Sequence, residues 1–254
     1  MAFITKQPLE ETLPESARLA LLDWDGTFRE GWTLLDWVPF LVRHRVLEPS
    51  THQRLNAIFD SYLEGQIDHD ELAASAGEVY ALGVAGASAG AISSLVSAYL
   101  EEDRRHLYRF VPDLCKLLRV HGLELAVITG APMAVVSAYT AELGISHCHG
   151  LELSVAEGHF TGAIVLNPGL STVKRELIAS FGERGAVIVF AIGDSTSDTP
   201  LFQAATAGVI VGNKLAVVPR RLQIRIAPHE EATSTLEQIS SLLDQVDRLA
   251  SQKK

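Results

Sequence analysis

Four short apolar runs, each followed by small or polar residues, constrain the fold of this 254-residue chain most strongly. The runs span residues 19–22, 123–129, 186–192 and 207–211. Continuous apolar runs of this length are typical of strands covered on both faces. Segments of helical character lie between them, including 112–121 and 131–143. The alternation predicts an α/β fold, with a doubly wound and mostly parallel sheet as a Rossmann-like core.

The stretch from Trp32 to Arg104 has a different pattern, because it contains no strong strand signal. Its helical segments are 34–44, 50–63, 70–80 and 91–105. We therefore expect a helical cap domain at 32–104, inserted into a core domain made of residues 1–31 and 105–254. The spacing of Trp32, Trp37 and Phe40 indicates the apolar core of that cap.

Two glycine-containing segments are expected to be connections. The stretch GVAGASAG at 83–90 has no following Lys-Ser/Thr and follows no strand, so a flexible link between cap helices is favoured over a phosphate loop. The segment 147–166, with Gly158 near its middle, predicts a β-hairpin.

Composition excludes some partners. The formal net charge of −10 and the absence of a long basic run argue against nucleic acid or an anionic membrane as a partner. Cys115 and Cys148 are the only cysteines, so a disulfide scaffold is not expected. The first sixteen residues lack the pattern of a signal peptide, and no apolar run is long enough to span a membrane. We expect a soluble, cytoplasmic protein, and the sequence leaves its oligomeric state open.

Chemically active residue types follow the predicted strands. The set comprises Asp23 and Asp25, Thr129 and Gly130, Asp194 and Asp198, and Lys174 at the start of a predicted helix. Ligands of open parallel sheets bind beyond the carboxyl ends of the strands, so these residues are expected to meet. Two neighbouring acids repel unless a cation lies between them, and Mg²⁺ prefers such oxygen ligands. Taken singly, the acids could also cap a turn at Gly26.

This combination suits phosphoryl transfer, which needs a nucleophile, positive charge on the phosphoryl oxygens and hydrogen-bond donors. Asp23 can attack phosphorus, while Mg²⁺ and Lys174 neutralise charge and Thr129 donates a hydrogen bond. Asp25 can protonate the departing alkoxide and later deprotonate the attacking water.

The motifs resemble those of the haloacid dehalogenase superfamily of phosphatases. The residues that carry the resemblance are Asp-x-Asp-Gly-Thr at 23–27, Thr129, Lys174 and Gly-Asp-Ser-x-x-Asp at 193–198. The position of the expected cap and the phrase Gly-His-Phe-Thr-Gly at 158–162 resemble the phosphoserine-phosphatase-like branch.

The resemblance implies a role for each acid. Asp23 is the implied nucleophile and a Mg²⁺ ligand, and Asp25 is the acid/base whose backbone carbonyl also binds the metal. Asp194 is implied as a further ligand, and Asp198 supports the metal site. Thr129, Gly130 and Lys174 are implied to hold the phosphoryl group.

The sequence departs from phosphoserine phosphatases where those enzymes bind the substrate. The segment 73–77 carries no arginine to bind a carboxylate, and Ser197 stands where the family has an asparagine. Phosphoserine is therefore expected to be a poor substrate. Arg29 and Glu30 closely follow the first motif and, with Ser197, are candidates for contacting the substrate.

These observations together predict a Mg²⁺-dependent phosphomonoester hydrolase that acts on a small phosphorylated metabolite through an aspartyl-phosphate. Two alternatives stay open: a phosphotransferase to an alcohol acceptor, and a non-catalytic sensor of a phosphorylated ligand. The run His147-Cys148-His149 also resembles a soft-metal cluster, but no fourth ligand is evident in the sequence.

Overall fold

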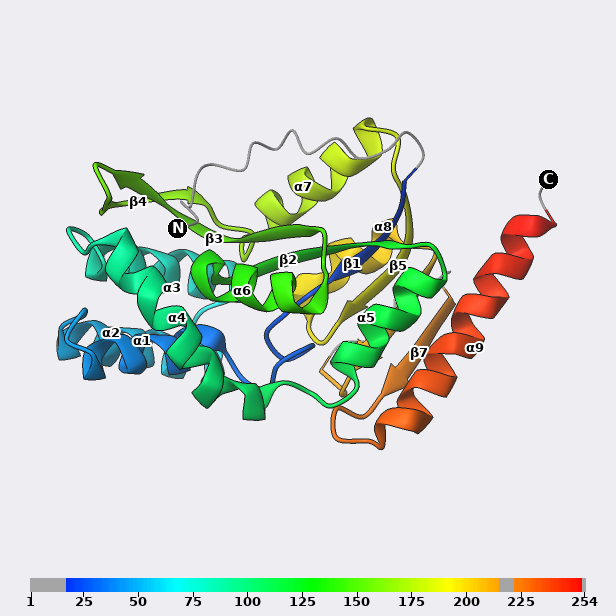
Figure 1. Cartoon of the computed structure of the whole chain (residues 1–254), viewed down its shortest axis with the longest axis horizontal. Helices are drawn as coiled ribbons and strands as arrows, with labels where there is room; N and C mark the ends of the chain where they lie inside the picture. The colour runs from blue at the N-terminus through cyan, green and yellow to red at the C-terminus, as the bar shows by residue number, and fades with distance from the viewer. Residues whose placement is uncertain (1–16, 215–221, 253–254) are drawn as a thin grey trace.

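The computed structural model describes residues 17–214 and 222–252, so the expectation for the first sixteen residues lies outside the described part. The described strands form one sheet in the order β4-β3-β2-β1-β5-β6-β7 (Figure 1). Their bounds are β1 Arg18–Leu22, β2 Glu124–Pro132, β3 His147–Ala156, β4 His159–Leu166, β5 Val187–Gly193, β6 Ala207–Val211 and β7 Leu222–Ile226. Neighbouring strands are parallel, except that β4 is antiparallel to β3. The predicted mostly parallel α/β sheet and the hairpin are confirmed.

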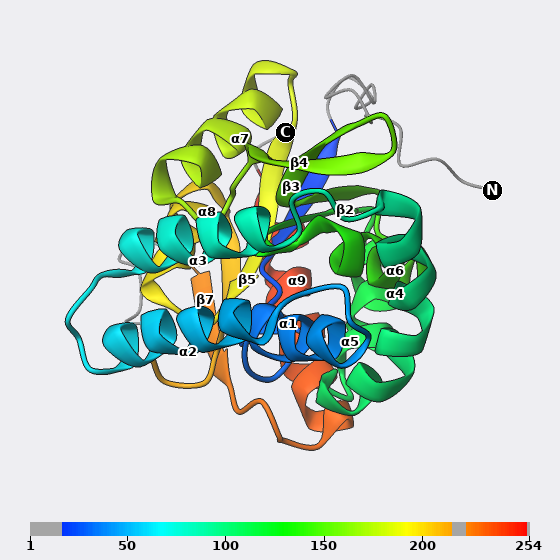
Figure 2. The same cartoon turned by 90° about the vertical axis from the view of Figure 1, so that its left-hand side faces the viewer.

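Helices cover both faces of the sheet. Their bounds are α5 Val111–Val120, α6 Met133–Leu143, α7 Ser171–Glu183, α8 Thr199–Ala204 and α9 Ala232–Ser251. Residues of β1 alternate between two buried clusters: Leu19 and Leu21 pack with α7 and α8, whereas Ala20 and Leu22 pack with α5, α6 and α9. Figures 1 and 2 show α7 on one side of the sheet and α5 on the other. Burial on both faces explains why the β1 sequence is continuously apolar.

Four helices follow β1 and lie together at one end of the sheet (Figures 1 and 2). They are α1 Thr33–Arg43, α2 Pro49–Leu63, α3 His69–Gly83 and α4 Ala89–Asp103, followed by a 3-10 turn, η1, at Arg104–His106. All four predicted helices are present, although α3 extends three residues past its predicted end, and the predicted last turn of α4 is this 3-10 turn. The division into a core and a cap stays a proposal.

The two chain segments that connect these helices to the sheet run side by side. The Glu30 amide donates to the carbonyl of His106 (2.9 Å), and the Tyr108 amide donates to the carbonyl of Phe28 (2.9 Å). A short antiparallel ribbon therefore joins α1–α4 to the rest of the chain.

The glycine-rich link between α3 and α4 is anchored, contrary to the expectation of a flexible connection. The Gly86 amide donates to the carbonyl of Phe160 (2.8 Å), and the Phe160 amide donates to the carbonyl of Ala87 (3.0 Å). The tip of the β3–β4 hairpin thus holds this link through backbone hydrogen bonds, which the composition of the link could not reveal.

The sequence predicts no element after residue 211, but the structure adds β7 and α9. Strand β7 is only partly buried along most of its length, which weakens the apolar pattern. Among the described residues, no helix is both long and apolar enough to cross a membrane.

Candidate active site

The turn after β1 places two carboxylates at the carboxyl end of the central strand. Asp23 is 7% exposed, and its amide donates to the carbonyl of Ile192 on β5 (3.1 Å). Gly26 follows with φ +80°, and a Cβ atom there would lie 2.4 Å from Oδ2 of Asp194. The motif therefore needs glycine both for its backbone conformation and for the close approach of Asp194.

Most of the predicted site residues line one cavity of about 410 Å³. They are Asp23, Asp25, Thr129, Gly130, Lys174, Asp194 and Ser197. They come from the segments after β1 and β5, from the second half of β2 and from the first turn of α7, and Ser197 lies in a 3-10 turn, η2, at Thr196–Asp198. Strand ends of a parallel sheet thus meet at one edge, as the strand pattern indicates.

Lys174 lies between two acids at the base of this cavity. Its Nζ atom is 2.9 Å from Oδ1 of Asp198 and 3.6 Å from Oδ1 of Asp23. Burial alone lowers the pKa of Lys174, but the charges of Asp198 and Asp23 outweigh it and raise the pKa above its ordinary value. The ammonium therefore stays charged beside Asp23.

Asp198 does not line the cavity but supports it from behind. Its Oδ2 atom accepts hydrogen bonds from the backbone amides of Asp194 (3.1 Å) and Ser195 (3.1 Å), while Oδ1 accepts from Lys174. Asp198 therefore fixes the loop that carries Asp194, which agrees with a supporting position.

The negative charge of the clustered carboxylates suits the binding of a divalent cation. Asp23, Asp194 and Asp198 each offer an oxygen, and these oxygens all lie within 4.8 Å of one another. Burial, with the charges of Asp198 and Asp194, raises the pKa of Asp23 well above its usual value, against the opposing effect of Lys174. Burial and Asp198 raise the pKa of Asp194 to about 6. A cation between Asp23 and Asp194 would relieve this repulsion.

The side chain of Asp25 is held by the first residue of α1. Its Oδ1 atom accepts hydrogen bonds from the amide (3.0 Å) and the hydroxyl (2.5 Å) of Thr33. Burial raises the pKa of Asp25 to about 6, although Arg29 and Thr33 oppose the shift. A carboxyl with this pKa is suited to proton transfer near neutral pH.

Thr129 and Gly130 lie on β2, which continues to Pro132, so α6 begins two residues later than the sequence predicts. The Thr129 hydroxyl oxygen accepts from the Ala131 amide (3.1 Å), which leaves its hydrogen for another acceptor. A Cβ atom on Gly130 would lie 3.0 Å from the Cα atom of Gly169, so only a small residue fits.

The structure does not bring Arg29 or Glu30 into the cavity, and both candidate substrate contacts are corrected. The Arg29 side chain is 0% exposed and donates to Asp103 (Nη2 to Oδ1, 2.6 Å), to Asp36 and to the carbonyl of Glu30 (2.7 Å). Glu30 is exposed, and its carboxylate lies 3.7 Å from His229. Arg29 therefore has a structural role, because its donors are used inside the protein.

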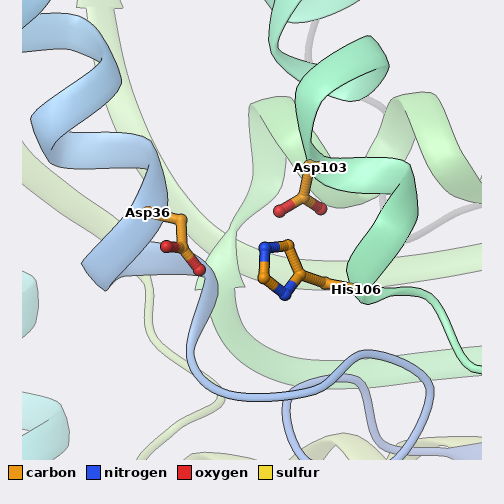
Figure 3. Close-up of side chains that lie close together, drawn as sticks. All are labelled: Asp36, Asp103 and His106. Atoms are coloured by element: carbon orange, nitrogen blue, oxygen red, sulfur yellow. The ribbon is translucent and has the colours of Figure 1, made fainter.

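A second group of metal-ligand types surrounds this arginine. Asp36 of α1, Asp103 of α4 and His106 of η1 point toward one another (Figure 3). The guanidinium of Arg29 contacts both carboxylates. The positive charge that these acids require is thus supplied by the protein itself.

The cavity lining also contains residues that the sequence does not predict as site residues, among them Lys214, His69 and Trp32. Lys214 follows β6 and donates to Oδ2 of Asp194 (3.2 Å), so the rule that polar residues follow strands could have found it. His69 lies at the start of α3 and lines the cavity. Trp32 also lines the cavity, whereas Trp37 and Phe40 are buried in the core as expected.

Comparison with known proteins agrees with this architecture. A family profile described as haloacid dehalogenase-like hydrolase matches residues 20–203. A phosphoserine phosphatase of Lactococcus lactis is 24% identical over 148 residues, which cover 57% of this chain. The chain spans 64% of that relative, less than two thirds of its length.

Solved structures share the fold. A Bordetella pertussis protein of unknown function matches with a TM-score of 0.64 and 21% identity, over 77% of this chain and 90% of that one. A substrate-bound phosphoserine phosphatase matches with a TM-score of 0.61 and 16% identity, over 88% of this chain and 99% of that one. With the family profile covering most of the sheet and the site, the chain belongs to the haloacid dehalogenase-like hydrolase family.

Proposed function

We propose that this chain is a Mg²⁺-dependent phosphomonoesterase that acts on a small phosphorylated metabolite through an aspartyl-phosphate on Asp23. The observation that carries the proposal is the position of Asp23 in one cavity with Asp194, Lys174 and Asp25. Membership in a hydrolase family and the phosphatase names of its relatives support it.

Two covalent steps follow from this arrangement. A carboxylate oxygen of Asp23 attacks phosphorus, the bond from phosphorus to the alcohol oxygen breaks, and Asp25 gives its proton to the departing alkoxide. Asp25 then takes a proton from water, whose oxygen attacks phosphorus, and inorganic phosphate leaves while the Asp23 carboxylate is restored. Lys174, Thr129 and Gly130 are the proposed phosphoryl contacts.

Asp23, Asp194 and the backbone carbonyl of Asp25 are the proposed metal-binding groups, and Asp198 is their support. Bound Mg²⁺ would neutralise charge on the phosphoryl oxygens and lower their repulsion from Asp23. In this proposal residues 32–104 form a cap over a core of residues 1–31 and 105–254. The cytoplasmic location of the protein stays a prediction.

Phosphate release from para-nitrophenyl phosphate, with and without Mg²⁺, tests the proposal. Asp23→Asn should lower turnover at least about a thousandfold, because no other group replaces the nucleophile. Asp113→Asn, which changes an exposed acid on α5, is the matched control and should keep full activity. Turnover by Asp23→Asn close to that of the unchanged protein would refute the mechanism.

Product analysis with an added alcohol separates hydrolysis from transfer. A hydrolase releases inorganic phosphate in equal amount to the alcohol product, whereas a phosphotransferase forms a new phosphoester. Binding of a phosphorylated ligand without any product would instead indicate a sensor.

A further inference from the structure

The cavity is lined by a wall of ring and aliphatic side chains in addition to its acidic residues. Trp32, Phe59 and Tyr62 line it, with ring centroids 5.0 Å apart for Trp32 and Phe59 and 6.4 Å apart for Trp32 and Tyr62. Leu34 and Leu72 extend this wall. In Figure 2, the helices α1, α2 and α3 that supply most of it lie in front of the strand ends. Because the acids and Lys174 are the proposed contacts of the phosphoryl group, the alcohol part of a bound phosphoester would contact the apolar wall, which makes up much of the remaining lining.

The ammonium groups at the cavity already have partners. Lys174 pairs with Asp198 at 2.9 Å, and Lys214 pairs with Asp194 at 3.2 Å. No arginine of residues 17–214 or 222–252 lines the cavity, and Ala73 and Ala76 occupy the adjoining part of α3. Among the described residues, a carboxylate on the alcohol part would find no arginine there, and its nearest exposed cation would be Lys214, which already contacts Asp194.

A positively charged alcohol is disfavoured as well. Nζ of Lys214 lies 5.9 Å from the centroid of the Trp32 ring, so a cation already occupies the neighbourhood of that ring. The rings of Trp32 and Phe59 are in contact rather than spaced to enclose a cation. The contacting rings of Trp32 and Phe59 offer an apolar surface instead.

The polar group on the α3 side of the cavity is also uncharged. Nδ1 of His69 is buried and has no hydrogen-bond partner among the described residues. Burial, and then the charge of Lys174, lowers the pKa of His69, which favours the neutral imidazole. His69 therefore adds no positive charge to the cavity lining on α3.

We infer that the site selects phosphomonoesters of an uncharged alcohol that carries a ring-sized apolar group, such as an aryl-methyl or cycloalkyl-methyl group. The inference rests on the proposed function, because it specifies the alcohol part of the same substrate. Burial of such a group against Trp32, Phe59 and Tyr62 supplies binding free energy that a small or charged alcohol does not gain.

A matched set of esters tests this selectivity: ethyl phosphate, benzyl phosphate, phosphoethanolamine and phosphoserine. The alkoxides of ethanol and benzyl alcohol are leaving groups of similar basicity. The ratio of kcat/KM for benzyl phosphate to kcat/KM for ethyl phosphate therefore reports recognition of the alcohol part rather than chemical activation. Benzyl phosphate should exceed each of the other three at least about tenfold in kcat/KM. A benzyl-to-ethyl ratio near one, or phosphoserine as the best substrate, would overturn the inference.

Substitution of one wall residue locates the selectivity. Tyr62 is only partly buried, so Tyr62→Ala should fold, and it should lower the benzyl-to-ethyl ratio at least about fivefold. Leu82→Ala, which changes an exposed residue on α3 outside the cavity lining, is the control and should keep the ratio. An unchanged ratio in Tyr62→Ala would contradict the assignment of the wall.

A binding measurement separates failure of this inference from failure of the proposed function. Benzylphosphonate and ethylphosphonate cannot be hydrolysed, and their affinities in Mg²⁺ are measurable by calorimetry. Tighter binding of benzylphosphonate by about tenfold, without hydrolysis of any of the esters or of acetyl phosphate, would retain the selectivity and refute the phosphatase. Equal affinities with active hydrolysis would refute the selectivity alone.

Discussion

Lys174 and Asp198 form a buried ion pair directly behind Asp23, with Nζ 2.9 Å from Oδ1 and both side chains at most 3% exposed. The same ammonium lies 3.6 Å from Asp23. One cation thus balances two acids, and removal of its charge leaves buried carboxylates without compensation.

Lys174→Met keeps the length of the side chain and removes its charge. We predict that kcat/KM for para-nitrophenyl phosphate falls at least about a hundredfold, because developing charge on the phosphoryl group loses a preorganised partner. Lys116→Met, at an exposed lysine on α5, should have no effect. A loss below about threefold, with a circular dichroism spectrum like that of the unchanged protein, would exclude Lys174 from the phosphoryl site.

Asp194→Asn tests the metal site without any substrate. We predict that Mg²⁺ binding, measured by calorimetry, weakens at least about tenfold, because an amide oxygen replaces one carboxylate ligand. Asp244→Asn changes an acid on α9 that does not line the cavity, and it should leave the affinity unchanged. Equal Mg²⁺ affinity in Asp194→Asn would place the metal elsewhere.

The buried contact between Arg29 and Asp103 should matter for stability. Asp103 also accepts from the hydroxyls of Tyr99 (2.9 Å) and Tyr139 (3.0 Å), so the interaction joins α4 to α6 and to the turn after β1. Asp103→Asn should lower the free energy of unfolding by about 3–5 kcal/mol, since Arg29 loses its buried counter-ion.

Urea denaturation measures this change. Asp113→Asn breaks an exposed ion pair with Lys116 and should cost less than about 1 kcal/mol. Similar losses in the two variants would show that the buried pair contributes no more than a surface pair.

The lowered pKa of His149 predicts that the free energy of unfolding depends on pH. Burial, with the neighbouring His147 and Arg184, lowers the pKa of His149 to about 4, whereas the unfolded chain has the ordinary value of 6.5. Between these values the unfolded state binds more protons, so the contribution of His149 is fully present above pH 6.5 and is lost as the pH falls toward 4. The loss amounts to about 3 kcal/mol.

A comparison of variants separates the effect of His149 on stability from that of carboxylates that titrate in the same pH range. Unfolding free energies at pH 7 and pH 4.5 should differ less in His149→Phe than in the unchanged protein. His159→Gln, at an exposed histidine on β4, should keep the original difference. An unchanged pH dependence in His149→Phe would contradict a buried neutral imidazole.

The sequence predicts the ends of β1 and β5 well because buried parallel strands have continuous apolar sequences and functional residues follow them directly, whereas β2 continues three residues beyond Thr129. Asp23, Thr129 and Asp194 are located by this rule, and so is Lys174 by its place at the start of a helix. Their meeting in one cavity follows from the parallel order of the sheet.

Contacts between segments that are distant in the sequence could not be predicted from it. Arg29 follows the first motif, but its partner Asp103 lies 74 residues away, so its burial could not be inferred. Trp32 fits the helical spacing of a core residue, yet it precedes α1 in an extended conformation and its side chain reaches the cavity. The surroundings of the Arg29 and Trp32 side chains are therefore determined by tertiary contacts.

Mass spectrometry of the acid-quenched protein detects phosphorylation of Asp23 directly. After a short reaction with acetyl phosphate and Mg²⁺, we predict a phosphoryl group on the peptide that contains Asp23, and none in Asp23→Asn. Hydroxylamine should remove it, because an acyl-phosphate reacts with that nucleophile. Turnover of acetyl phosphate with no phosphoryl group on Asp23, or with a phosphoryl group on another residue, would contradict the role of Asp23 as nucleophile.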